Sequence, residues 1–309
     1  MLSYYIVLLI SKIVCLLPWS LCRKIAWLIA HIVWPLVPKR RKKMAKENIM
    51  RCLGVDEVEA ERISKESAMQ WGDLLFEVLR FPVLKKTMKS HVKIEGLHYL
   101  TDYINSTERE GKGAVIMTCH SDNWELMGGA FAQYGISLVG VAKKQKSSGM
   151  DRFINEYRTM IGMHITYKTG VREMYQMLAE GWFIGLIMDQ DTSRHDGIIV
   201  KFFNQPTNYM PGAASMSRFK DVPIFPAFMH RNGDGTHTLI VQPAIKVEKT
   251  KDKREDIKRT TQHLATLTEE HIRNYPEEWF WLHDRWKSMR EEFTPEEVAD
   301  LARLIRNEE

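Results

Sequence analysis

Short apolar runs that alternate with amphipathic segments occupy the chain from residue 91 to residue 241. Apolar runs of this length are typical of β-strands, and the amphipathic segments between them are typical of helices. A chain in which strands and helices alternate folds into an α/β domain. We therefore expect a central sheet flanked by helices. The predicted strands cover residues 91–95, 114–119, 137–142, 182–188, 198–203, 223–228 and 238–241.

Helices are predicted before, between and after these strands. Pro276 suits the first turn of the helix predicted at 276–290. Proline has a φ close to that of a helix, and the N–H that it lacks would have no partner in the first turn. No Gly-rich phosphate loop and no dinucleotide fingerprint interrupts the series, so no nucleotide cofactor is expected. The predicted helices cover residues 44–89, 122–133, 150–161, 171–179, 212–219, 252–274 and 276–290.

The first forty residues differ in composition from the rest. Residues 1–21 contain a single charge, Lys12, and a second apolar stretch covers residues 25–38. About 20 apolar residues are needed to span a bilayer as a helix. The first stretch just reaches this length and the second does not. Two arrangements are therefore compatible with the sequence: one spanning helix with an interfacial segment, or a helical hairpin that lies in one leaflet. A cleaved signal peptide fits poorly, because no basic region precedes the apolar run and no cleavage site follows it.

Five consecutive basic residues, at 39–43, follow this apolar region. Such a cluster is attracted to anionic headgroups and favours the cytoplasmic side of a membrane. Because the formal charge of +5 is concentrated there, a nucleic-acid partner is not expected. The four cysteines have no paired spacing, which argues against a disulfide framework or a zinc site. We divide the chain into an anchor with its basic collar (1–43), a helical neck (44–90), an α/β domain (91–290) and a helical tail (291–309).

A histidine and a carboxylate lie five residues apart where the second predicted strand passes into a helix. An imidazole such as His120 can remove a proton from a bound hydroxyl, and a carboxylate such as Glu125 can fix its tautomer. This pair would suit acyl transfer to an alcohol. A purely structural alternative is a capping box, with Asp122 as N-cap and Glu125 three positions later.

Two more carboxylates, Asp189 and Asp191, directly follow the strand predicted at 182–188. Open α/β sheets place ligand-contacting groups at the carboxyl ends of their strands. The alternative is that either aspartate only caps a turn. Further along, Gly212 lies in the first turn of a small-residue helix whose free N–H groups could face an anion.

Taken together, these segments resemble the lipid A biosynthesis acyltransferases, the lauroyl and myristoyl transferases within the lysophospholipid acyltransferase superfamily. The resemblance covers nearly the whole chain and implies a mixed central sheet of the glycerolipid acyltransferase type, preceded by a membrane-anchoring helical segment. It is carried by the apolar N-terminus, residues 47–49, 120–125, 189–191 and 202–203, Gly212 and the tryptophan-rich segment 276–287.

The resemblance also implies roles for individual residues. His120 would be the general base and Glu125 its orienting carboxylate, while Arg158, Asp189 and Asp191 would bind substrate. The family often has two basic residues near Arg158 and this chain has one, so a solvated helix face is the alternative for Arg158. No metal and no cofactor is implied.

The implied reaction moves an acyl chain from a thioester, acyl carrier protein or acyl-CoA, directly to a hydroxyl of a lipid A precursor. The enzyme would work at the inner membrane, with its catalytic domain on the cytoplasmic face. Oxyanion donors could be backbone N–H groups at a helix start or Arg158. Two alternatives stay open, an acyltransferase for another glycolipid such as a phosphatidylinositol mannoside, and a non-catalytic lipid-binding protein of the same fold.

Overall fold

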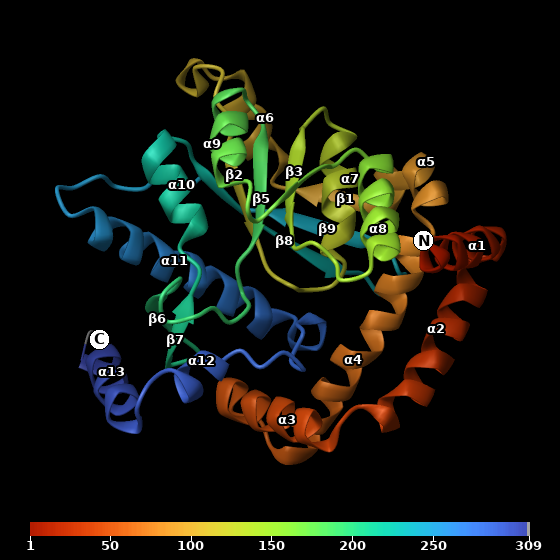
Figure 1. Cartoon of the computed structure of the whole chain (residues 1–309), viewed down its shortest axis with the longest axis horizontal. Helices are drawn as coiled ribbons and strands as arrows, with labels where there is room; N and C mark the ends of the chain where they lie inside the picture. The colour runs from red at the N-terminus through yellow and green to blue at the C-terminus, as the bar shows by residue number, and fades with distance from the viewer. Residues whose placement is uncertain (308–309) are drawn as a thin grey trace.

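The computed structural model describes residues 1–307 and contains a mixed seven-stranded sheet flanked by helices (Figure 1). The strands lie in the order β1-β9-β8-β2-β5-β3-β4. Neighbouring strands are parallel except β8 and β9, which are antiparallel. The strands are β1 (Val92–Glu95), β2 (Val115–Thr118), β3 (Leu138–Ala142), β4 (His164–Tyr167), β5 (Phe183–Ile187), β8 (Ile224–Arg231) and β9 (His237–Val241). The predicted α/β fold is thus confirmed.

Two strands were missing from the sequence prediction. β4 is a short edge strand, and its alternation of exposed and covered residues is too brief to be distinguished from a loop. β7 (Gln205–Tyr209) contains Pro206, which disfavours a strand, yet it pairs with β6 (Ile198–Phe202) as a separate hairpin. The hairpin turn is made by two residues with positive φ, Phe203 and Asn204.

The strand β2 is buried on both faces, and its alternating side chains enter two different cores. Val115 and Met117 pack into a cluster that includes residues of α9, α10 and α11, while Ile116 packs into a cluster with residues of α6, α7 and α8. Helices therefore cover both faces of the sheet. These helices are α6 (Leu97–Asn105), α7 (Met127–Ala132), α8 (Ser148–Met160), α9 (Val171–Ala179), α10 (Gly212–Lys220) and α11 (Lys253–Asn274).

The helix predicted for residues 276–290 was wrong. A 3-10 turn η4 (Pro276–Glu278) and a short helix α12 (Lys287–Glu291) are joined by irregular chain, and α13 (Pro295–Asn307) follows. The indole N–H of Trp279 donates to Asp189, and that of Trp281 donates to the carbonyl of Pro276. The first of these contacts joins residues 90 positions apart, so tertiary packing overrides the local helical pattern.

Five helices precede the sheet and lie along one side of the molecule (Figure 1). The first apolar stretch is broken at Pro18, which separates α1 from α2. Within residues 1–307 no single helix is both long and apolar enough to cross a membrane. A bent pair, residues 19–36 with 39–53 at 103°, passes that length and composition test together. The five helices are α1 (Leu2–Leu16), α2 (Trp19–Val33), α3 (Lys39–Leu53), α4 (Glu57–Leu79) and α5 (Phe81–His91).

Candidate active site

His120 lies just beyond the carboxyl end of β2, and its imidazole contacts a carboxylate from the neighbouring parallel strand. Its Nδ1 is 2.8 Å from Oδ1 of Asp189, which follows β5. The other carboxylate oxygen of Asp189 accepts a hydrogen bond of 2.6 Å from the indole N–H of Trp279. Parallel pairing of β2 with β5 thus brings together two groups that are 69 positions apart in sequence.

This arrangement fixes the ionisation of the carboxylate and the tautomer of the imidazole. Burial raises the pKa of Asp189, but the charge and hydrogen bond of His120 and the Trp279 N–H outweigh it and hold the pKa below its ordinary value. An ionised Asp189 accepts the Nδ1–H of His120, which leaves the lone pair on Nε2. In this structure that nitrogen is 3.4 Å from the side-chain amide of Gln190. The imidazole is 17% exposed and packs edge-on against Trp124 at 4.7 Å.

Glu125 does not contact His120 as the sequence prediction required. It lies in the 3-10 turn η3 (Trp124–Leu126) and accepts two hydrogen bonds from Arg158 of α8, at 2.7 and 2.5 Å. Burial lowers the pKa of Arg158, but Glu125 outweighs it and the pKa is raised. The carboxylate that contacts His120 is Asp189. Arg158 is not on a solvated helix face, since its side chain is only 17% exposed.

Asp191 is directed away from His120, toward the C-terminal segment. Its carboxylate accepts hydrogen bonds from the backbone N–H and the hydroxyl of Ser288, at 2.8 and 2.7 Å, and lies 3.6 Å from the buried Arg285. Its own N–H donates to His283. These contacts are structural, as in the alternative that Asp191 only caps a turn, although the residues that it holds are the distant Ser288 and Arg285.

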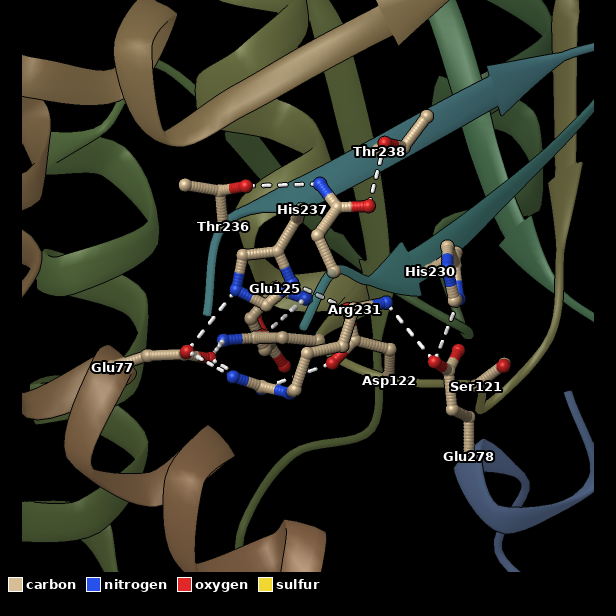
Figure 2. Close-up of polar contacts among 12 residues, drawn as sticks. Glu77, Ser121, Asp122, Glu125, His230, Arg231, Thr236, His237, Thr238 and Glu278 are labelled. Atoms are coloured by element: carbon tan, nitrogen blue, oxygen red, sulfur yellow. Dashed lines mark hydrogen bonds and ion pairs between the residues drawn. The ribbon is translucent and has the colours of Figure 1, made fainter. Parts of the chain in front are cut away.

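The loop after His120 is held by a buried ion network, which we define as Glu77, Asp122, Asn123, Arg231 and His237 (Figure 2). Asp122 has a φ of 46° and contacts His237 at 2.5 Å and Arg231 at 3.0 Å. Glu77, from α4, accepts from Arg231, His237 and Asn123. The capping box is therefore absent, because Asn123 caps η3 and Asp122 belongs to the network.

The C-terminal segment holds the other side of the same loop. Ser121 forms a β-bridge with Trp279, and its hydroxyl is 3.0 Å from Nε2 of His271. The backbone N–H of Asp122 donates to the carbonyl of Glu278. Because the loop is fixed from both sides, the position of His120 depends on chain segments that are far apart in sequence.

Charges within the buried ion network balance when His237 is protonated. Burial lowers the pKa of His237, but Asp122 and Glu77 outweigh it and raise the pKa to about 9. Burial also lowers the pKa of the neighbouring His91, to about 4, so His91 is neutral at pH 7. In the part of the chain that the structure describes, Glu77, His91 and His237 form the one cluster with metal-ligand spacing. Both nitrogens of His237 already contact carboxylates, which describes an ion network better than a metal site.

We expect the protonated His237 to make stability depend on pH. Its folded pKa of about 9 exceeds the ordinary 6.5, so its contribution is full below pH 6.5 and is lost as pH rises to about 9. The free energy of unfolding should fall by up to about 3 kcal/mol across this window. Urea unfolding at a series of pH values measures this change in the free energy of unfolding. In His237→Gln the slope should largely disappear, and an equal slope in the variant would contradict the assignment.

A narrow apolar cavity lies between the sheet and α8, at the carboxyl end of β2. One end is formed by Thr118, Trp124 and the Glu125–Arg158 pair. Two glycines, Gly140 of β3 and Gly185 of β5, line it, and neighbouring side chains pack against both, since a Cβ at Gly140 would lie 2.7 Å from Met163. The remaining lining side chains are apolar: Met127, Leu138, Val141, Ala142, Met163, Ile165 and Ile187. Its volume is about 60 Å³, well below the roughly 300 Å³ or more of a typical ligand pocket, so in this structure it has room for only a short part of a fatty chain beside its polar end.

Several acyltransferases are similar to this chain. The family model of the bacterial lipid A biosynthesis acyltransferases matches residues 1–288. A phosphatidylinositol mannoside acyltransferase of Mycolicibacterium smegmatis is 29% identical over 190 residues, 60% of this chain and 60% of that protein. A lipid A biosynthesis acyltransferase of Haemophilus influenzae is 25% identical over 296 residues, 92% of this chain and 89% of that protein. The 1-acyl-sn-glycerophosphate acyltransferase structure from Thermotoga maritima matches 84% of this chain and 99% of its own, with 11% identity and a TM-score of 0.38.

Proposed function

Since this chain belongs to the bacterial lipid A biosynthesis acyltransferase family, we propose that it moves a fatty acyl chain from a thioester to a hydroxyl of a lipid A precursor. The chain is an O-acyltransferase. The observation that supports the proposed transfer to a hydroxyl is the contact between His120 and Asp189, close to an apolar cavity.

In the proposed reaction, His120 acts as a general base. Its Nε2 accepts the hydroxyl proton while the oxygen attacks the thioester carbonyl, and Asp189 stabilises the imidazolium that forms. The C–S bond then breaks, and the thiolate leaves with the proton that the imidazolium returns. No acyl group becomes attached to the protein. General-base catalysis of this kind contributes roughly 10²–10⁴ to the rate.

The Glu125–Arg158 pair is assigned to the thioester end of the cavity. Glu125 occupies Nε and Nη2 of the guanidinium, so Nη1 is the group that we assign to the carbonyl oxygen as negative charge develops. This gives Arg158 the oxyanion role, and gives Glu125 the role of holding it. Both residues line the cavity with Trp124, which packs against His120.

We expect Gly185→Val to shift the preference toward shorter acyl chains. A Cβ at Gly185 would lie 3.3 Å from the side chain of Leu138, and both residues line the cavity. A methylene of lost space typically changes discrimination about tenfold or more. The measurement is kcat/KM for a series of donors. Gly233→Val is the matched control, because Gly233 lies in an open turn with no heavy atom near its Cβ position. An unchanged preference in Gly185→Val would place the acyl chain elsewhere.

Association with a membrane is part of the proposal. The exposed faces of α1 and α2 carry many large apolar side chains, including Leu9, Ile13, Trp27 and Ile32, and the basic residues 39–43 follow. Apolar surface beside basic residues favours binding at an anionic membrane surface. We therefore place the catalytic domain on the cytoplasmic face of the inner membrane, where thioester donors are available.

A second acceptor is favoured by a specific observation. Relatives named phosphatidylinositol mannoside acyltransferase are 29% and 25% identical to this chain, the latter over 78% of it. A mannosylated phospholipid is therefore the alternative acceptor. A non-catalytic lipid-binding role is disfavoured, because a binding protein would not need the His120–Asp189 contact.

The test uses the full-length chain in detergent micelles. Labelled acyl carrier protein and acyl-CoA are each offered with a lipid A precursor or a phosphatidylinositol mannoside, and the products are identified by mass spectrometry. Transfer to the lipid A precursor is expected. Transfer only to the phosphatidylinositol mannoside would show that this lipid, and not the lipid A precursor, is the acceptor. The absence of transfer with every pair, from a folded chain, would contradict the catalytic proposal.

A further inference from the structure

A second, larger groove lies outside the active site, between α2 and α4, which are side by side at one edge of the molecule (Figure 1). Its volume is about 1100 Å³. The two helices are in close contact at Ala26 and Gly72, where a Cβ on the glycine would be 3.0 Å from the carbonyl oxygen of Ala26. The groove lies along this helix pair, and Arg231 forms part of its wall.

Three cations of the groove have no counter-ion within ion-pair distance among residues 1–307. These are Arg23 and Lys24 of α2 and Lys65 of α4. The arginines Arg62 and Arg231 also line the groove, but each is paired with carboxylates. The unpaired cations are therefore free to bind an anion.

The acidic groups of the groove do not cancel these charges. Glu66 is paired with Arg62 at 2.5 Å. Burial raises the pKa of Asp73, and Arg231 and Arg23 oppose this shift. Even when ionised, this one carboxylate does not offset the three unpaired cations. The groove therefore has an excess of positive charge.

Apolar side chains complete the groove beside the cations. Trp27 is 59% exposed and Leu28 is 53% exposed, and both line it. They continue into the exposed apolar face of α2, which includes Ile32. A cationic groove that passes into exposed apolar surface matches a ligand with a phosphate and a hydrocarbon chain, rather than a free anion.

We propose that this groove binds one anionic phospholipid, with the phosphate on Arg23, Lys24 and Lys65 and a hydrocarbon chain along Trp27 and Leu28. The inference rests on the proposed membrane association but not on the acceptor or donor of the acyl reaction. The bound phosphate would lie near Arg231, whose guanidinium contacts Asp122 in the loop that follows His120.

The first test compares two triple variants of the full-length chain. The groove variant is Arg23→Gln, Lys24→Gln and Lys65→Gln. The matched control removes the same charge from the loop before α11 and the start of that helix, with Lys251→Gln, Lys253→Gln and Arg254→Gln. Each variant is floated with vesicles of phosphatidylcholine alone or mixed with phosphatidylglycerol.

We expect the wild type and the control to prefer the anionic vesicles, and the groove variant to lose about 100-fold of that preference, since each basic residue near the surface contributes about 1 kcal/mol. Binding to neutral vesicles should be similar in all three. Equal losses in both variants would indicate diffuse charge, and no loss in either would show that the groove is not the site. Either result overturns the proposal.

A second measurement is native mass spectrometry of the chain released from micelles that contain phosphatidylglycerol. One retained phospholipid is expected on the wild type and the control, and none on the groove variant. Retention by the groove variant would overturn the proposal, as would displacement of the phospholipid by inorganic phosphate alone. Neither measurement requires acyl transfer, so a failed activity assay would leave this test intact.

Discussion

His120→Ala is expected to lower the rate of acyl transfer roughly 10²–10⁴-fold, the range that a positioned general base contributes. The imidazole lies at the carboxyl end of β2, and its Nε2 keeps a lone pair because Nδ1 contacts Asp189. The acceptor hydroxyl would replace the long 3.4 Å contact of this Nε2 with the side-chain amide of Gln190. Without it, the acceptor hydroxyl must lose its proton to water. The loss should be in kcat more than in KM, because the proton moves only in the transition state. Single-turnover assays with a saturating donor measure it.

The matched control for this variant is His263→Ala. His263 is an exposed histidine of α11, so its removal takes away the same side chain at a distance from the site. It should leave the rate within about twofold, as expected of a surface position. Thermal unfolding should show that His120→Ala is folded. A folded His120→Ala enzyme with a nearly unchanged rate would exclude His120 as the base.

Asp189→Asn is expected to reduce the rate by a comparable factor, about 10³–10⁴-fold, the scale seen when the carboxylate of a catalytic triad becomes an amide. The reason lies in the two hydrogen bonds of Asp189. The indole N–H of Trp279 can only donate, so the amide oxygen of an asparagine must face it. The amide NH₂ then faces Nδ1 of His120 and forces the proton onto Nε2, where it prevents the imidazole from acting as a base.

Glu125→Gln tests whether Asp189 or Glu125 is the carboxylate that orients His120, since the sequence spacing suggested Glu125. Because Glu125 contacts Arg158 and not His120, its loss should reduce the rate less than Asp189→Asn does. The two variants are matched, since each replaces one carboxylate by its amide. The measurement is kcat as a function of pH for both. A larger loss in Glu125→Gln, with Asp189→Asn still active, would return the orienting role to Glu125.

Much of the fold could be predicted because its signals are local. The apolar runs that became β2, β3 and β5 are short and bounded, and the helix predicted at 171–179 is α9 without change. Where the local pattern was weak or misleading, the prediction failed. The tryptophans of residues 276–290 have helical spacing in part, but all three lie in the irregular chain between η4 and α12 and are buried in one core cluster.

The buried ion network was not found from the sequence. Glu77 is one charge within an otherwise apolar helix segment, and this is the signal that could have identified it. Its partners, Asp122, Arg231 and His237, belong to other elements, and no spacing rule relates them. Their shared burial is visible only in three dimensions.

The sequence by itself determined the chemical types at the site, an imidazole after one strand and carboxylates after another, and placed both at the carboxyl edge of one sheet. Only the tertiary structure decided which carboxylate meets the imidazole. Of the two carboxylates close to it in sequence, Asp122 contacts His237 and Glu125 contacts Arg158. Asp189 reaches His120 because β2 and β5 pair in parallel. Strand order in a sheet follows from long-range packing, and a carboxylate can fix an imidazole only at hydrogen-bond distance, so spacing along the chain could not make that choice.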